Sequence, residues 1–191
     1  TEHSTILNSR LIRNTSGQSG GGAEFWSGGN IVNCQIVGNN AESGGGFTNI
    51  DNDNVLTNVT NTLVVMNQAS VGGGVYSTDP IHASNSIFWD NTDDMSNAEE
   101  AQIFGEGHTV SHSIVQGLSL YAGNGNMNLD PDFVDPLGPD MVPANGDEDY
   151  RLSAGSPAID AGDSTALPAD GTDLDSDADT SEPIPFDFDG D

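Results

Sequence analysis

The chain has 191 residues, of which 30 are acidic and three are basic, and its formal net charge at pH 7 is −27. A chain this acidic repels nucleic acids and anionic membranes, so neither is an expected partner, whereas divalent cations should be attracted. No apolar run approaches the roughly 18 residues of a membrane-spanning helix, which predicts no membrane insertion. The single cysteine, Cys34, allows no disulfide framework and is expected in the core.

Residues 1–118 contain a repeat. Short apolar runs end in an asparagine, and a glycine triplet follows at residues 20–22, 44–46 and 72–74. The asparagines are Asn14, Asn39, Asn67 and Asn91, spaced 24 to 28 residues apart. The fourth run has no triplet, and residues 101–104 are expected to take its place. Repetition at this spacing predicts a solenoid.

Each repeat alternates a small residue with an apolar residue two positions later. The small residues are Ser9, Cys34, Thr62, Ser86 and Ser113, and the apolar ones are Leu11, Ile36, Val64, Phe88 and Val115. This alternation has the period of a strand, whereas the Gly, Asn, Ser and Thr content disfavours helices. Each coil should run strand, asparagine turn, glycine corner, strand and turn, with the asparagine amides stacked in a ladder. The expected fold is an all-β parallel β-helix of about five coils.

Residues 119–165 should form an irregular cap, because the repeat ends near residue 121 and prolines follow. The outward positions beside the inward apolar column become apolar themselves from the second coil on, as at Val37, Val65 and Trp89. Such a stripe on a soluble solenoid needs a cover. We expect the cap to fold back onto it, or a neighbouring subunit or domain to dock there. The side chains expected on the stripe are Phe133, Val134, Leu152 and Ile159.

Residues 166–191 form an Asp-rich terminal segment. Alternating aspartates place several hard oxygen ligands on one side of an extended turn, which suits Ca²⁺. The candidate ligands are Asp173, Asp175, Asp177, Asp179, Asp187 and Asp189. The segment is not an EF-hand loop, since Ala178 and Ile184 replace the required Gly and Glu. The alternative is a solvated acidic linker. Weaker calcium candidates are Asp51, Asp53 and Asn54, and Asp130, Asp132 and Asp135.

Two patterns are candidates for catalysis or metal binding. The stretch 91–94, Asn-Thr-Asp-Asp, resembles the carboxylate cluster of β-helix galacturonases, which separate an acid and a base. Their Gly-His-Gly and Arg-Ile-Lys partner motifs are absent, and the chain has no lysine to act as a lyase base. His108 and His112 lie in a predicted strand, so they share no helical face and a structural role is favoured.

The repeat pattern, apolar-x-x-Asn followed by Gly-Gly-Gly-apolar, resembles right-handed parallel β-helix proteins of the pectin-lyase-like superfamily. It resembles in particular the repeats of polymorphic outer-membrane proteins. Segments 130–136, 149–152, 155–163 and 172–175 resemble the C-terminal part of large secreted β-helix proteins from bacteria such as planctomycetes. The resemblance implies a right-handed coil, an extracellular or cell-surface location in a bacterium, and a chain that is part of a longer polypeptide.

Three functions stay open at this level. The favoured one is a structural and adhesive module, stabilised by calcium, that contacts copies of itself or neighbouring domains. The second is a polysaccharide-active lyase or hydrolase. The third is a non-catalytic solenoid that binds polysaccharide, with Trp26, Trp89 or Tyr76 stacking on sugar rings. The first is favoured because the sequence shows no coherent catalytic set.

Overall fold

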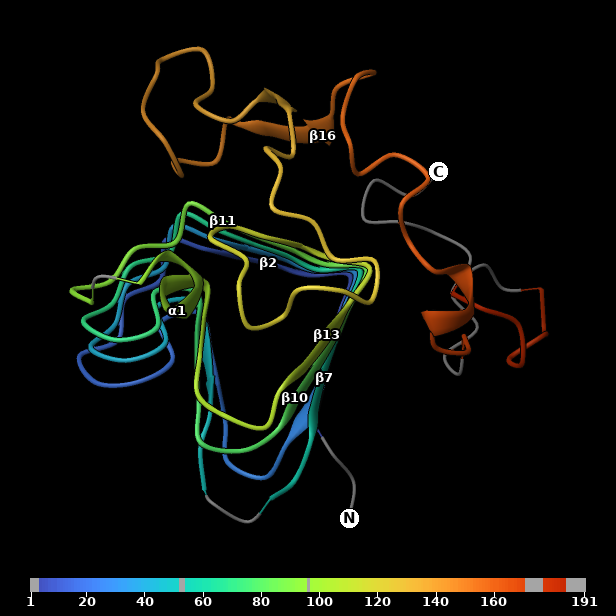
Figure 1. The fold of residues 1–191 in the computed structure, drawn as a ribbon, viewed down its shortest axis with the longest axis horizontal. Coiled ribbons are helices and arrows are strands. Elements are labelled where there is room, and N and C mark those ends of the chain that lie inside the picture. The colour runs from blue at the N-terminus through green and yellow to red at the C-terminus, as the bar shows by residue number, and fades with distance from the viewer. Residues whose placement is uncertain (1–3, 52–53, 96, 171–176, 185–191) are drawn as a thin grey trace.

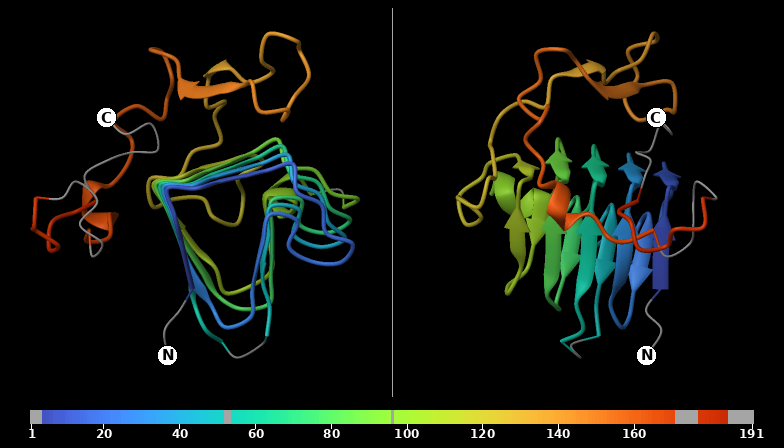
Figure 2. Two further views of the ribbon diagram at one scale, coloured as in Figure 1. Left: turned by 180° about the vertical axis from the view of Figure 1, so that it is seen from behind. Right: turned by 90° about the vertical axis from the view of Figure 1, so that its right-hand side faces the viewer.

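A computed structural model describes residues 4–51, 54–95, 97–170 and 177–184. The expected all-β parallel solenoid is confirmed. It has about four turns, and its three parallel sheets enclose a triangular core when seen along the axis (Figure 1). The strands of successive turns stack side by side across each sheet (Figure 2).

Successive turns contribute neighbouring strands to each sheet. Sheet 1 contains β1 (Ser4–Leu7), β4 (Gly29–Val32), β7 (Thr57–Thr60), β10 (Ile81–Ser84) and β13 (Thr109–Ser111). Sheet 2 contains β2 (Arg10–Ile12), β5 (Gln35–Val37), β8 (Leu63–Val65), β11 (Ile87–Trp89) and β14 (Ile114–Val115). Sheet 3 contains β3 (Ala23–Phe25), β6 (Phe47–Asn49), β9 (Val75–Ser77) and β12 (Ile103–Phe104). The helix α1 (Ala98–Gln102) precedes β12.

A sharp corner separates sheets 1 and 2, and it corrects the predicted order of elements within a coil. One column of residues there has φ between 46° and 52°: Asn8, Asn33, Asn61, Asn85 and His112. Asparagine tolerates this left-handed conformation because its short side chain can bond locally. The column therefore ends one strand and begins another, so a full coil has three strands where the sequence suggested two.

The asparagine ladder is present as expected. Asn14 Nδ2 donates to Asn39 Oδ1 at 3.0 Å, and the same bond joins Asn39 to Asn67 and Asn67 to Asn91 at 2.9 Å. At the end of the ladder, Gln102 Oε1 accepts from Asn91 Nδ2 at 2.7 Å. The prediction that residues 101–104 take the place of a fourth triplet holds for Ala101 and Gln102 only. Ile103 and Phe104 pair with Val75 and Tyr76, which follow the third triplet, so the place of the triplet falls at residues 100–102.

The glycine triplets form the corner before sheet 3. The first glycine of each triplet has φ near 60°. The second glycine lies directly against the next coil: a Cβ on Gly45 would be 2.3 Å from the Gln68 carbonyl oxygen and 2.5 Å from that of Gly73. Glycine is therefore required both for the conformation and for the close approach of stacked backbones.

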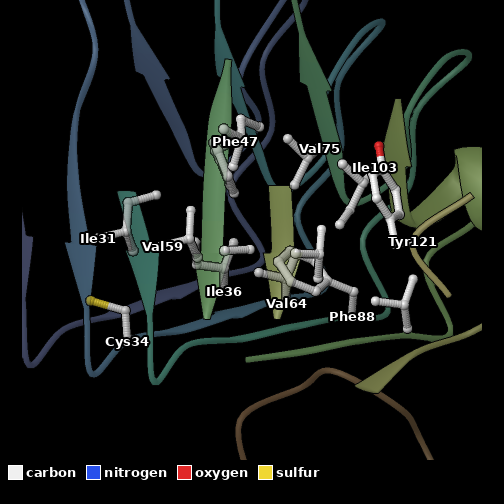
Figure 3. Close-up of a cluster of buried hydrophobic side chains, with 14 of the residues drawn as sticks. Ile31, Cys34, Ile36, Phe47, Val59, Val64, Val75, Phe88, Ile103 and Tyr121 are labelled. Atoms are coloured by element: carbon white, nitrogen blue, oxygen red, sulfur yellow. The ribbon is translucent and has the colours of Figure 1, made fainter. Parts of the chain in front are cut away.

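The solenoid interior is a single apolar cluster (Figure 3). The predicted inward column supplies Ile36, Val64, Phe88 and Val115, all fully buried. Cys34 lies in the same cluster, as expected, and burial raises the pKa of its thiol. Inside the core, hydrophobic burial is the main source of stability.

Residues 117–128 close the stack beyond β14. The buried carboxylate of Glu99 accepts the backbone N–H groups of Ser119, Leu120 and Tyr121 at 2.7, 2.8 and 3.2 Å. This arrangement places the Tyr121 ring in the core cluster. Burial and the nearby Glu99 carboxylate raise the pKa of Tyr121 to about 12.

The antiparallel hairpin β15 (Phe133–Asp135) and β16 (Asp149–Leu152) lies over sheet 2 (Figures 1 and 2). Phe133, Tyr150 and Ala144 form an apolar cluster with Val37 and Val65 of the outward stripe. Phe133 is thus on the stripe as predicted, but Val134 and Ile159 are 53% and 46% exposed, so their predicted burial there is wrong. In the hairpin Val134 lies between two inward positions and points the other way. The domain boundaries at 118 and 165 stay predictions.

Candidate functional site

A groove runs across the outer face of sheet 1. Its volume is about 620 Å³, and its second wall is a segment near the C-terminus that includes the 3₁₀ turn η1 (Ser164–Ala166). Figure 2 shows this segment passing across the strands of the sheet. The groove therefore lies on the solenoid surface, between the repeat and the residues that follow it.

The floor of the groove consists of two rows of side chains that the parallel register aligns. One row contains Thr5, Asn30, Asn58 and His82, and the other contains Leu7, Val32, Thr60, Ser84 and Ser111. In the first row, Asn58 Nδ2 donates to Asn30 Oδ1 at 3.0 Å, and Asn30 Nδ2 donates to Thr5 Oγ1 at 3.3 Å. The floor thus combines amides, hydroxyls and one imidazole with two apolar side chains, Leu7 and Val32, at the end formed by the first coils.

A pair of hydrogen bonds holds the second wall in place. Asn85 Nδ2 donates to the Asp163 carbonyl oxygen at 2.9 Å, and Asp163 N–H donates to Asn85 Oδ1 at 2.8 Å. Asn85 belongs to the left-handed corner column, so its side chain points out of the corner toward the segment. A bridge between Ala169 and Pro183 then ties the wall to the last described residues.

Two carboxylates line this wall. The pKa of Asp163 is lowered, first by the hydroxyl and N–H of Thr165 that donate to it. The Asp170 side chain is almost fully buried. Neither is free at the centre of the groove. None of the described residues that line the groove is a lysine or arginine. The arrangement can hydrogen-bond a polar ligand.

Of the predicted calcium ligands, only Asp177 and Asp179 lie within the described residues; Asp173, Asp175, Asp187 and Asp189 lie outside them. Asp177 Oδ1 accepts the Asp179 N–H at 2.7 Å, and Asp179 Oδ1 accepts the Ser181 N–H at 2.9 Å. The Ser181 hydroxyl and the Ser181 N–H, which both donate to Asp179 Oδ1, lower the pKa of Asp179. No group of three or more potential metal ligands occurs within the part of the chain described. The calcium site stays a prediction.

The weaker calcium candidates have different surroundings. The N–H groups of Asp51 and Asn54 donate to the buried carboxylate of Asp79 at 3.1 and 2.8 Å. Asp53 lies outside the described residues. Asp130 and Asp132 line a smaller cavity under the cap, and Asp135 does not.

The residues of the two candidate catalytic patterns make structural contacts. Asn91 is part of the ladder, and Asp93 Oδ2 accepts the Gly72 N–H at 3.1 Å. His108 is half-buried, and its Nδ1 accepts the Ile81 N–H at 3.2 Å. Burial lowers the pKa of His108. His112 occupies the corner column.

The three aromatic residues considered for sugar stacking do not form a strip. Trp26 follows β3 and is 63% exposed, whereas Trp89 lies on sheet 2 beneath the cap. The Tyr76 ring stacks on Phe104, with centroids 5.4 Å apart. The sequence pattern did not predict the groove on sheet 1. Asn30, Asn58 and His82 form a polar row on the outer face of the sheet, and this row could have indicated the groove. The row can be recognised only once the strands that contain these residues are known.

Comparison with protein-family models, with curated proteins and with solved structures finds no significant match. None of the helices among the described residues is long and apolar enough to span a membrane.

Proposed function

We propose that the chain is a non-catalytic structural and adhesive module of an extracellular or cell-surface protein, and that its sheet 1 groove holds a neutral polysaccharide. The groove carries this proposal. Asparagine and hydroxyl side chains both donate and accept hydrogen bonds, as sugar hydroxyls do. The net charge of −27 disfavours anionic polymers, so a neutral chain is the better match.

Three further points belong to the same proposal. The resemblance to right-handed β-helices of the pectin-lyase-like superfamily supports a bacterial surface location. The Asp-rich terminal segment supports stabilisation by calcium. Contacts with copies of the chain or with neighbouring domains would suit a solenoid that serves as a scaffold.

The groove is tested by binding to a panel of insoluble neutral polysaccharides, followed by calorimetry with soluble fragments of any polymer that binds. Asn58→Leu removes a floor amide, and Asn40→Leu is the matched control at an exposed asparagine outside the groove. We expect roughly tenfold weaker binding for Asn58→Leu alone, because an unpaired polar group on the ligand is costly. Equal binding by both variants, or no binding to any polymer, would contradict the proposal.

The second wall is tested separately with Asn85→Gly. Glycine keeps the left-handed corner but removes both hydrogen bonds to Asp163. Asn61→Gly is the control in the same column, outside the groove lining. Weaker polysaccharide binding in Asn85→Gly, with the control unchanged, is the expected result. Unchanged binding in Asn85→Gly would show that the segment forms no part of the site.

A further inference from the structure

A second cavity, separate from the sheet 1 groove, lies between sheet 2 and the cap. Its volume is about 170 Å³, below the roughly 300 Å³ at which sites for drug-sized ligands begin. Three aromatic and three acidic side chains contribute to its lining: Trp89, Phe133 and Tyr150, and Asp90, Asp130 and Asp132.

The aromatic residues give the cavity rigid walls. The Phe133 and Tyr150 rings are 5.4 Å apart and nearly perpendicular, at 86°. Both belong to the cap hairpin, whereas Trp89 comes from β11 of the solenoid. Tyr150 is fixed further because its hydroxyl donates to the Met66 sulfur at 3.6 Å. Aromatic faces in a preformed cavity attract a cation through the negative face of each ring.

The carboxylates lie at the exposed rim of the same cavity and are held by local hydrogen bonds. Asp90 Oδ1 accepts from Gln116 Nε2 at 3.1 Å, and Asp130 Oδ1 accepts the Asp132 N–H at 2.9 Å. Asp132 Oδ2 accepts from the Ser153 hydroxyl. The rim is therefore negative and ordered, and no basic side chain is among the described residues lining the cavity.

We propose that this cavity binds a quaternary or N-methylated ammonium group. A methylated ammonium ion is bulky, apolar on its surface and positively charged, so it matches aromatic walls with a carboxylate rim. Ca²⁺ fits less well, because it requires six to eight oxygen ligands and the rings supply none. The small volume excludes a sugar chain, so this site is independent of the polysaccharide groove.

The chain offers a direct optical test, because Trp26 and Trp89 are its only tryptophans. Trp26→Phe leaves Trp89 as the sole indole reporter within the cavity. Titration with choline chloride at constant ionic strength should give a saturable change in Trp89 emission. The uncharged isostere 3,3-dimethyl-1-butanol should give none, since it has the same shape without the charge.

Variants in the Trp26→Phe background identify the site. Phe133→Leu removes one ring but keeps an apolar side chain against sheet 2, and should weaken choline binding about tenfold. Asp90→Asn should weaken it several-fold, and Asp94→Asn, an exposed aspartate outside the cavity, should not. Circular dichroism and the melting temperature verify that each variant folds. The Asp90→Asn change keeps the size of the side chain, so it remains informative if Phe133→Leu does not fold.

Four results would overturn the proposal. They are the absence of a saturable choline signal, equal binding of the uncharged isostere, unchanged affinity in Asp90→Asn or in a folded Phe133→Leu variant, and a response to CaCl₂ that choline does not reproduce. The last result would identify the cavity as a metal site.

Discussion

Replacing Asn67 with alanine tests whether the amide ladder stabilises the solenoid. The Asn67 side chain is fully buried and makes four hydrogen bonds. Its Nδ2 donates to the Ile36 carbonyl oxygen and to Asn91 Oδ1, both at 2.9 Å. Its Oδ1 accepts from the backbone N and the Nδ2 of Asn39, also at 2.9 Å. Truncation removes all four bonds and leaves their partners buried.

The expected cost follows from these contacts. At about 1 kcal/mol net for each hydrogen bond, Asn67→Ala should lower the free energy of unfolding by about 4 kcal/mol. That is a large fraction of the roughly 5–15 kcal/mol of a typical domain. Asn14→Ala is the matched control, since Asn14 is exposed and its side chain donates one ladder bond, to Asn39. It should cost less than about 1 kcal/mol.

Urea unfolding followed by circular dichroism and by tryptophan fluorescence measures both variants. Agreement between the two probes is needed because solenoids can lose terminal coils separately. A difference of about 3 kcal/mol between the variants is expected. If Asn67→Ala and Asn14→Ala differ by less than about 1 kcal/mol, the ladder does not stabilise the fold as argued.

Three other outcomes are expected. Gly45→Ala should destabilise by more than about 2 kcal/mol, because its Cβ would lie 2.3 Å from a carbonyl oxygen of the next coil, whereas Gly17→Ala, with nothing within 4 Å, should be nearly neutral in the same urea assay. Burial lowers the pKa of His108 in the folded state, so its contribution to stability is full above the unfolded pKa of about 6.5 and is lost as pH falls toward the lower folded pKa. The loss of unfolding free energy between pH 7.5 and pH 5.5 should therefore be smaller in His108→Gln than in the parent protein, and equal losses in the two proteins would refute this. Removal of calcium with EDTA should lower the melting temperature, and an unchanged transition would count against a structural calcium ion.

The solenoid could be predicted from the sequence because the same pattern of apolar residues, asparagine and glycine triplet recurs in successive coils. The columns at Asn67 and Gly45 follow from the spacing of asparagines and glycine triplets alone. The corner at Asn8 was harder to predict. Asparagine is common both in turns and in ladders, so the sequence pattern did not distinguish a strand position from a left-handed corner.

The candidate sites depend on contacts that no repeat specifies. The hydrogen bonds between Asn85 and Asp163 join residues that are 78 positions apart in the sequence. The cavity under the cap likewise combines Trp89 of the solenoid with Phe133 and Tyr150 of the hairpin. The cap sequence has no repeat, so no periodic pattern predicts which cap residue packs against which coil. Hydrophobicity alone indicated that a cover exists, and it selected Phe133 correctly, but it could not separate the two faces of the β15–β16 hairpin at Val134.

The amide ladder also gives the solenoid a direction. Each ladder side chain donates toward the next coil and accepts from the one before, so every coil presents the same donor at one end and the same acceptor at the other. A whole coil of 24 to 28 residues can therefore be inserted or removed with every amide still paired. An insertion of a few residues within a strand would instead shift the rest of that strand out of register with its neighbours. Duplication of entire coils is thus the route by which this scaffold can change length in evolution or in design, and Gln102 marks where that series ends.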